Sequence, residues 1–102
     1  MRLEYYPLEK LKKEILEIVG HHLDLAQYKV FFFGSRVLGK GSDRSDIDIG
    51  IEGPAAVSDK AMDAIKEAAF NLPTLYKIDI VDFKEVDKKF YQVVKEKVEY
   101  LN

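Results

Sequence analysis

Hydrophobic and polar positions along the chain follow two different periods, and each change of period marks a new element. From Leu8 to Gly20 apolar residues recur every three or four positions, which predicts an amphipathic helix. From Lys29 to Phe33 the run KVFFF is apolar, aromatic and β-branched, and Gly34 ends it. This run predicts a buried strand whose phenylalanines belong to the core.

Strict alternation returns in the segment Asp46–Glu52, which reads DIDIGIE. It predicts a strand with three isoleucines on one face and two aspartates and a glycine on the other. Gly53 and Pro54 break this strand, and Ser58 is a good cap for a helix from about Asp59 to Asn71.

The last third of the chain repeats the change of period. Residues 75–83 (LYKIDIVDF) alternate, which predicts a third strand with a carboxylate in its middle. Residues 84–100 carry apolar side chains at helical spacing, which predicts a final amphipathic helix. The expected order of helix, strand, strand, helix, strand and helix predicts an α/β (α+β) domain in which helices flank one small mixed sheet.

Composition narrows the functional classes. A chain of 102 residues with 47% hydrophobic and 33% charged residues suits one domain, residues 1–102, of a globular protein. The net charge of −2 argues against strong binding to nucleic acid through charge alone. No apolar run approaches the roughly 18 residues of a membrane span, and no cysteine is present. We therefore expect a cytoplasmic protein without membrane attachment.

Three aspartates occupy strand positions where apolar residues would cost less to bury. Asp46 and Asp48 share a strand face, about 6.5 Å apart, and Asp79 lies in the middle of the third strand. Paired carboxylates suit Mg²⁺, which binds oxygen ligands and substrate phosphates. A third carboxylate from a neighbouring strand would allow two ions about 3.5 to 4 Å apart. The alternative is that these aspartates simply line a solvated sheet face.

A second group of residues suits a phosphate. Gly34 ends the first strand and permits close approach to the backbone, and Ser35 supplies a hydroxyl and an N–H group. A short helical turn at residues 35–38 would favour an anion at its start. Arg36 adds a charge that suits a phosphate or an aspartate. A phosphate cradle followed by paired carboxylates predicts a site for a nucleoside triphosphate.

The stretch GSRVLGKGSDRSDIDI resembles the signature of the nucleotidyltransferase superfamily related to the DNA polymerase β palm. Arg36, Gly39 and the pair Ser45-Asp46 resemble its minimal nucleotidyltransferase (MNT) branch in particular. KIDIVDF is similar to the strand that carries the third carboxylate of the family. The resemblance implies a palm-like fold and a minimal catalytic domain.

The resemblance also implies roles for single residues. Gly34 and Ser35 would bind the triphosphate of ATP together with Arg36 and Ser45. Asp46 and Asp48 would ligate two Mg²⁺ ions, and Asp79 would be the third catalytic and metal-binding carboxylate. Asp82 competes for that third role, but it sits near the strand end, where a solvated or capping aspartate is commoner. Lys77 shares a face with Asp79 and could reach a phosphate, although an exposed strand lysine is the simpler interpretation.

MNT proteins are commonly paired with HEPN-domain proteins in toxin–antitoxin modules. The resemblance therefore implies transfer of AMP from ATP to a tyrosine hydroxyl of a HEPN toxin. Two alternatives stay open: a non-catalytic antitoxin that neutralises a HEPN partner by complex formation, and a phosphatase with an aspartate nucleophile, which fits the strand context less well. The sequence leaves a homo-oligomer or hetero-oligomer open.

Overall fold

The computed structural model describes residues 1–39 and 46–102, which contain both helices and strands. The first half contains α1 (Leu8–Gly20), β1 (Lys29–Phe33) and β2 (Ile47–Glu52). The second half contains α2 (Asp59–Phe70), β3 (Ile78–Asp82), α3 (Lys88–Val94) and β4 (Glu99–Tyr100). The predicted bounds of α1 and β1 are confirmed to the residue, and those of β2 and α2 to within one residue.

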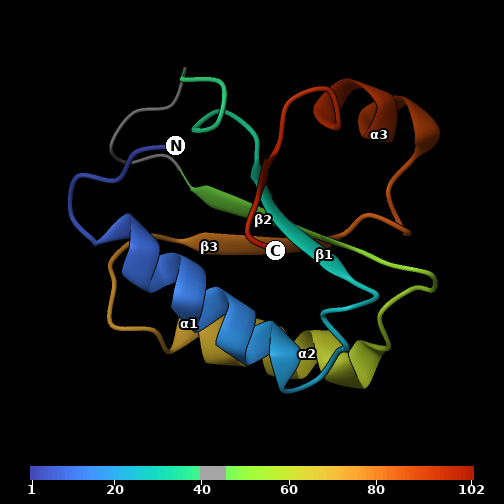
Figure 1. Cartoon of the computed structure of the whole chain (residues 1–102), viewed down its shortest axis with the longest axis horizontal. Helices are drawn as coiled ribbons and strands as arrows, with labels where there is room; N and C mark the ends of the chain where they lie inside the picture. The colour runs from blue at the N-terminus through green and yellow to red at the C-terminus, as the bar shows by residue number, and fades with distance from the viewer. Residues whose placement is uncertain (40–45) are drawn as a thin grey trace.

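The strands form a mixed sheet in the order β3-β2-β1-β4. β1 runs antiparallel to both β2 and β4, whereas β2 and β3 run parallel. Helices α1 and α2 lie side by side on one face of this sheet, and α3 lies on the other (Figure 1). The prediction of a small mixed sheet flanked by helices is confirmed.

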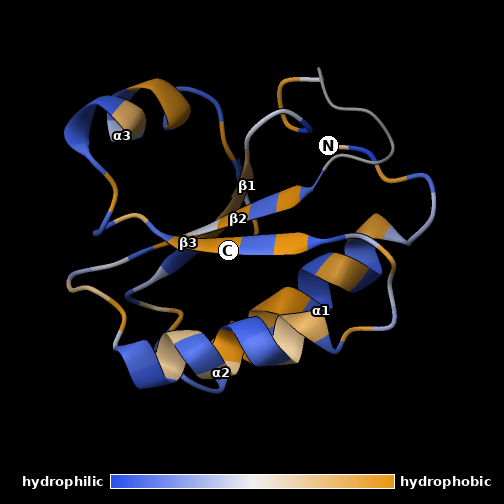
Figure 2. Ribbon diagram, turned by 180° about the vertical axis from the view of Figure 1, so that it is seen from behind, coloured by the Kyte–Doolittle hydropathy of each residue, from blue (hydrophilic) through white to orange (hydrophobic). Residues whose placement is uncertain are grey.

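The main core lies between the sheet and the pair α1 and α2. Ile47, Ile49 and Ile51 of β2 are fully buried there, as the alternation predicted. Blue and orange positions alternate along β2 and β3 in Figure 2, since hydrophobic and polar residues alternate along both strands. Ile15 of α1 and Ile65 of α2 pack from the helical side.

Helix α2 begins where the sequence predicted, because the Ser58 hydroxyl accepts a hydrogen bond from the Ala61 N–H at 3.2 Å.

In residues 1–39 and 46–102 no helix is both long and apolar enough to cross a membrane.

The opposite face of the sheet has two halves with different chemistry. One half is an aromatic cluster of Phe31, Phe33 and Phe83. The Phe83 ring meets the rings of Phe31 and Phe33 edge to face, with ring centroids 4.8 and 5.1 Å apart, respectively. Gly50 lies beneath these rings, and a Cβ atom there would come within 2.6 Å of Phe83 Cε1. The strand therefore needs glycine at this position to leave room for the rings of Phe31 and Phe83.

Helix α3 is attached over the aromatic cluster by a polar group as well as by apolar contacts. Glu52, at the end of β2, accepts hydrogen bonds from the Tyr91 hydroxyl and from Lys95 Nζ, the latter at 2.8 Å. Lys95 Nζ also donates to the Tyr100 hydroxyl at 3.0 Å and lies 4.7 Å from the centroid of the Phe31 ring. These contacts leave the other half of the face, which carries the aspartates, uncovered by α3.

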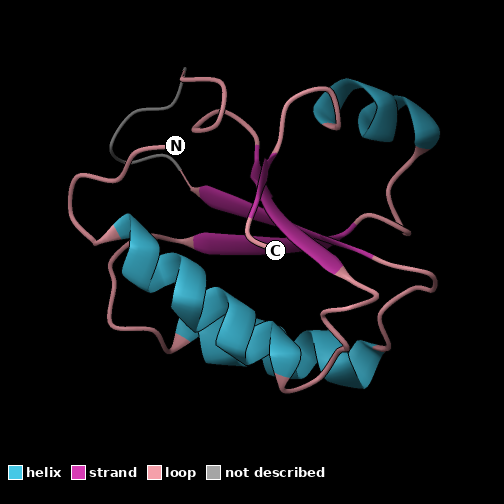
Figure 3. Cartoon of the chain, in the orientation of Figure 1, coloured by secondary structure: helices cyan, strands magenta, loops and turns pink. Residues whose placement is uncertain are grey.

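The predicted helix over residues 84–100 is wrong in length. The helix occupies only Lys88–Val94, and Glu99–Tyr100 pair with β1 instead (Figure 3). Asn102 continues this attachment, since its side chain accepts from Val30 N–H at 2.8 Å and donates to Tyr28 O at 2.8 Å. The edge of β1 offers backbone hydrogen bonds that helical periodicity does not reveal, so pairing with β1 ended the helix early.

The third strand is also shorter than predicted. It begins at Ile78, and Leu75, which alternation placed in the strand, is fully exposed.

Replacement of Gly50 by alanine should destabilise the fold, because the new methyl group would overlap the buried rings of Phe31 and Phe83. Overpacking of this kind costs about 1–3 kcal/mol. Urea unfolding followed by circular dichroism measures the change. Gly20→Ala is the matched control, because its Cβ would meet only the Leu25 side chain at 3.2 Å and should change stability by less than about 0.5 kcal/mol. Equal stability of Gly50→Ala and the wild type would contradict the proposed steric role.

Candidate functional site

The uncovered half of the second sheet face carries four charged residues from two parallel strands. Asp48 and Asp79 are partners in the register of β2 and β3. The preceding pair, Ile47 and Ile78, points to the core on the opposite face. Asp46 and Lys77 precede these isoleucines and therefore turn to the same face as Asp48 and Asp79. We call Asp46, Asp48 and Asp79 the carboxylate cluster.

The negative charge of Asp48 is disfavoured by its surroundings. Its pKa is raised from the ordinary value, first because the side chain is half-buried, and then because Asp79 and Asp46 repel its charge. Lys77 acts in the opposite direction and lowers this pKa. Like charges directly across a strand pair are destabilising. Asp48 is thus poised to gain from any cation that approaches the face.

Lys77 lies between the two outer carboxylates. Its Nζ is 3.8 Å from Asp46 Oδ2 and 3.9 Å from Asp79 Oδ1. Both carboxylates remain more than two-fifths exposed, and the lysine side chain is 71% exposed. These are loose ion pairs, of the kind that contributes about 0–1 kcal/mol to stability.

The turn after β1 brings the predicted phosphate cradle against the cluster. Gly34 has a φ of +84°, and a Cβ atom there would overlap the carboxylate of Asp48. Both features require glycine. Leu38 N–H donates to Gly34 O at 3.2 Å, so the segment makes a single helical turn rather than a helix. Ser35, the first residue of that turn, is exposed beside the cluster.

Arg36 is positioned by an aromatic side chain that precedes β3. Its guanidinium lies 4.7 Å from the centroid of the Tyr76 ring. The Tyr76 hydroxyl in turn accepts hydrogen bonds from the backbone N–H groups of Glu4 and Tyr5, at 3.2 and 3.1 Å. The N-terminal segment therefore helps to orient the cation that the sequence assigned to phosphate.

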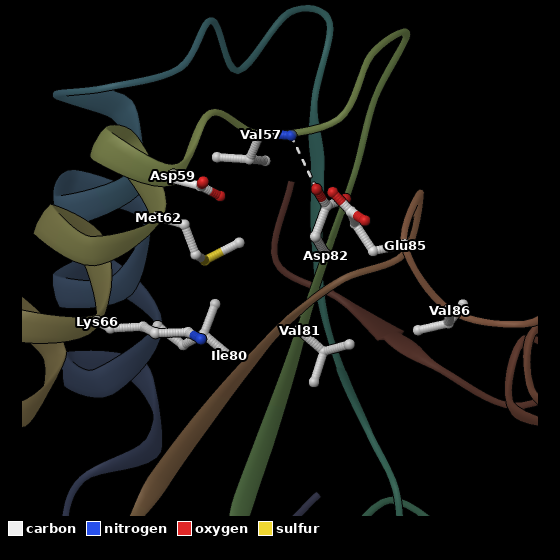
Figure 4. Close-up of a pocket in the computed structure, with 9 residues that line it drawn as sticks. All are labelled: Val57, Asp59, Met62, Lys66, Ile80, Val81, Asp82, Glu85 and Val86. Atoms are coloured by element: carbon white, nitrogen blue, oxygen red, sulfur yellow. Dashed lines mark hydrogen bonds between the residues drawn. The ribbon is translucent and has the colours of Figure 1, made fainter.

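Asp82, the competitor of Asp79, has a structural role instead. Its carboxylate is buried and accepts hydrogen bonds from Val57 N–H at 2.8 Å and from Lys84 N–H at 2.9 Å. Figure 4 shows it directed toward Val57 at the rim of a cavity of about 470 Å³, on the side of the sheet that α2 covers. None of the aspartates of the carboxylate cluster lines this cavity.

The structure thus brings together Gly34, Asp48 and Asp79, with Asp46 immediately before β2. Ser35 and Arg36 follow Gly34 in the same turn. Ser45 lies outside the described residues. Sequence reasoning missed two contacts: the ion pairs of Lys77 with two aspartates, and the cation–π contact of Arg36 with Tyr76. The spacing K-x-D on one strand face was the available signal for the first.

The donor set suits a hard divalent cation. Three carboxylates from adjacent strands share one open face, and the raised pKa of Asp48 reflects negative charge that such a cation would neutralise. As the side chains stand, no group of three or more histidine, aspartate or glutamate residues in ranges 1–39 and 46–102 is arranged to hold a metal ion. Two of the three carboxylates are instead paired with Lys77.

Comparison with known proteins places the chain among nucleotidyltransferases. Residues 8–101 match the family described as nucleotidyltransferase domain. A protein of Haemophilus influenzae described as "probable protein adenylyltransferase MntA" is 34% identical over 96 residues, which cover 85% of this chain and 84% of that protein.

Two solved structures share the fold at lower identity. One is a toxin–antitoxin complex with AMP-PNP, with a TM-score of 0.69 and 21% identity over 89% of this chain and 72% of that chain. The other is a tri-AMPylated Shewanella oneidensis HEPN toxin in complex with its MNT antitoxin, with a TM-score of 0.67 and 18% identity over 92% and 71% of the two chains. At these identities the likeness concerns the fold.

The different surroundings of Asp79 and Asp82 predict different effects of the same substitution. Asp82→Asn places an amide against two buried backbone donors and should lower the free energy of unfolding by about 1–3 kcal/mol. Asp79→Asn alters an exposed, loosely paired group and should change stability by no more than about 0.5 kcal/mol. Urea unfolding of both variants compares them. A larger loss in Asp79→Asn than in Asp82→Asn would contradict these assignments.

Removal of the Asp48 charge should change the pH dependence of stability. Because the folded pKa of Asp48 is raised, the folded state holds its proton more tightly than the unfolded state, and stability falls as pH rises from the ordinary value of 3.8 through the folded pKa. Asp48→Asn should remove this fall, so its advantage over the wild type should be larger at pH 7 than at pH 3.5. Unfolding titrations across this range measure it, with the exposed Asp63→Asn as control. An advantage that is independent of pH would disprove the assignment.

Proposed function

This chain belongs to the nucleotidyltransferase domain family, and we propose that it transfers AMP from ATP to a tyrosine hydroxyl of a HEPN-domain toxin, in a reaction that depends on magnesium. The observation that carries the proposal is the meeting of Gly34, Asp48 and Asp79 at one open sheet face. A backbone position suited to phosphate lies there beside carboxylates suited to a metal ion.

The nature of the acceptor is supported by the relatives. The MntA protein of Haemophilus influenzae is described as a protein adenylyltransferase, and the Shewanella oneidensis antitoxin is bound to a tri-AMPylated HEPN toxin. The complex with AMP-PNP supports ATP as the donor. We propose a HEPN partner and an ATP donor for this chain on the same basis.

The residues of the turn would hold the triphosphate. Gly34 lets a phosphate come close to the backbone, the Ser35 hydroxyl and N–H can donate to it, and Arg36 supplies positive charge. The segment is one turn long, so the Arg36 charge and the local N–H groups must carry more of the binding than a helix dipole would. We propose Ser45 as a further contact only because the pair Ser45-Asp46 resembles the MNT motif.

The carboxylate cluster would carry out the transfer. Asp46, Asp48 and Asp79 would hold magnesium, which when bound neutralises the phosphates and stabilises the attacking and leaving oxygens. The acceptor oxygen forms a bond to the α-phosphorus while the bond from that phosphorus to the bridging oxygen breaks, and pyrophosphate leaves. Asp79, whose side chain is 43% exposed, would take the proton of the acceptor hydroxyl.

A second function has support from the surface. Phe70, at the end of α2, and Leu75, in the loop that follows, are large apolar side chains exposed to 86% and 106%. Such side chains suit contact with a partner protein. A binding module that neutralises a HEPN toxin by complex formation would use them without catalysis.

The setting of the reaction is proposed on general grounds. The absence of cysteine throughout the chain agrees with a reducing compartment, and we propose that a single domain of this kind acts in the cytoplasm. Its assembly with the toxin would be a hetero-oligomer.

The direct test is incubation of the protein with ATP labelled at the α-phosphate, Mg²⁺ and a HEPN partner encoded beside it. We expect label on the partner, and at least a ~100-fold lower rate with Asp46→Ala/Asp48→Ala, because metal ligands contribute several kcal/mol to transition-state stabilisation. Mass spectrometry of the labelled partner identifies the acceptor side chain.

Asp63→Asn, on the exposed side of α2, is the matched control and should label the partner at the wild-type rate. Absence of transfer by the wild type would exclude catalysis. If the double variant still neutralised the toxin in cells as well as the wild type does, complex formation would be the function that matters.

A further inference from the structure

The carboxylate cluster already has a cation in contact with it, contributed by the chain itself. Lys77 Nζ lies within 4 Å of an oxygen of Asp46 and of an oxygen of Asp79. Asp48 lies beside Asp79 in the register of the two strands, so three carboxylates share the face with one ammonium group.

The backbone fixes where this lysine can reach. Ile47 N–H donates to Lys77 O at 2.8 Å, which extends the parallel pairing of β2 and β3 by one step beyond β3. Lys77 is thereby held beside Asp46 across the strands and two residues before Asp79 along its own strand. On this face the oppositely charged residues Asp46 and Lys77 lie next to two residues of the same charge, Asp48 and Asp79.

The pairing is loose, which distinguishes it from a structural salt bridge. Both separations exceed hydrogen-bond length, and 71% of the lysine side chain is exposed. A partly buried pair such as Lys95 with Glu52, at 2.8 Å, holds two elements together. Within the part of the chain that the structure describes, the Lys77 side chain makes no hydrogen bond. It can therefore move into solvent without breaking one.

We propose that Lys77 is a resident counter-ion of the carboxylate cluster, which a divalent cation displaces when it binds. The inference rests on the proposed function in so far as the cluster binds metal. Without metal, the ammonium offsets repulsion among the aspartates. Its presence lowers the affinity of the cluster for metal alone, because metal and ammonium compete for the oxygens of Asp46 and Asp79.

The test is direct binding of Mn²⁺ in the absence of nucleotide, followed by electron paramagnetic resonance of the free ion, with no turnover required. Lys77→Met should bind Mn²⁺ roughly two- to tenfold more tightly than the wild type, as expected for loss of two competing exposed ion pairs. Lys77→Arg, which keeps the charge, should bind within about twofold of the wild type. Thermal unfolding checks that each variant is folded.

Lys66→Met is the matched control, because it removes the same charge from α2, which covers the other face of the sheet. It should leave Mn²⁺ affinity unchanged. Unchanged or weaker binding by Lys77→Met, or equal tightening by Lys66→Met, would overturn the role of Lys77 while leaving the proposed function intact. Binding by the wild type that is no tighter than binding by Asp48→Asn, with and without ATP, would overturn both.

Discussion

The parallel pairing of β2 with β3 is the constraint on which the rest of the site depends. It places Asp48 directly beside Asp79 and brings Lys77 next to Asp46. The same register turns Ile47, Ile49 and Ile80 into the main core. A slip of one residue would exchange the two faces of a strand, burying carboxylates and exposing isoleucines. The cost of that exchange is what holds the charged groups in position.

One half of the second sheet face stabilises the fold, and the other half carries the candidate site. Its aromatic half is closed by α3, and the bonds of Glu52 to Tyr91 and Lys95 secure that helix. Its carboxylate half stays open to solvent, where ions and phosphates can approach. Each half contains a glycine that cannot be replaced without overlap. A side chain at Gly50 would overlap aromatic rings, and one at Gly34 would overlap the Asp48 carboxylate. A single strand, β2, therefore contributes to both halves.

Much of this was predictable from local pattern, and the failures have a common cause. The capped helix α2 and the alternating strand β2 were predicted closely, because their signals lie within a few neighbouring residues. The long C-terminal helix was wrong, because residues 99–100 pair with β1, a contact remote in sequence. Leu75 was wrongly placed in a strand for a related reason: alternation shows which residues could form a strand, not where a neighbouring strand begins.

The sequence by itself determined the family, and it predicted the two groups of site residues and the choice of Asp79 over Asp82, because motif residues and strand alternation are local properties. Only the tertiary structure decided that Asp82 binds the backbone of residues 57 and 84, and that Lys77 pairs with Asp46 and Asp79. These contacts depend on the register between strands and on distances across the sheet. Strand register is set by packing of the whole core, which no short stretch of sequence contains.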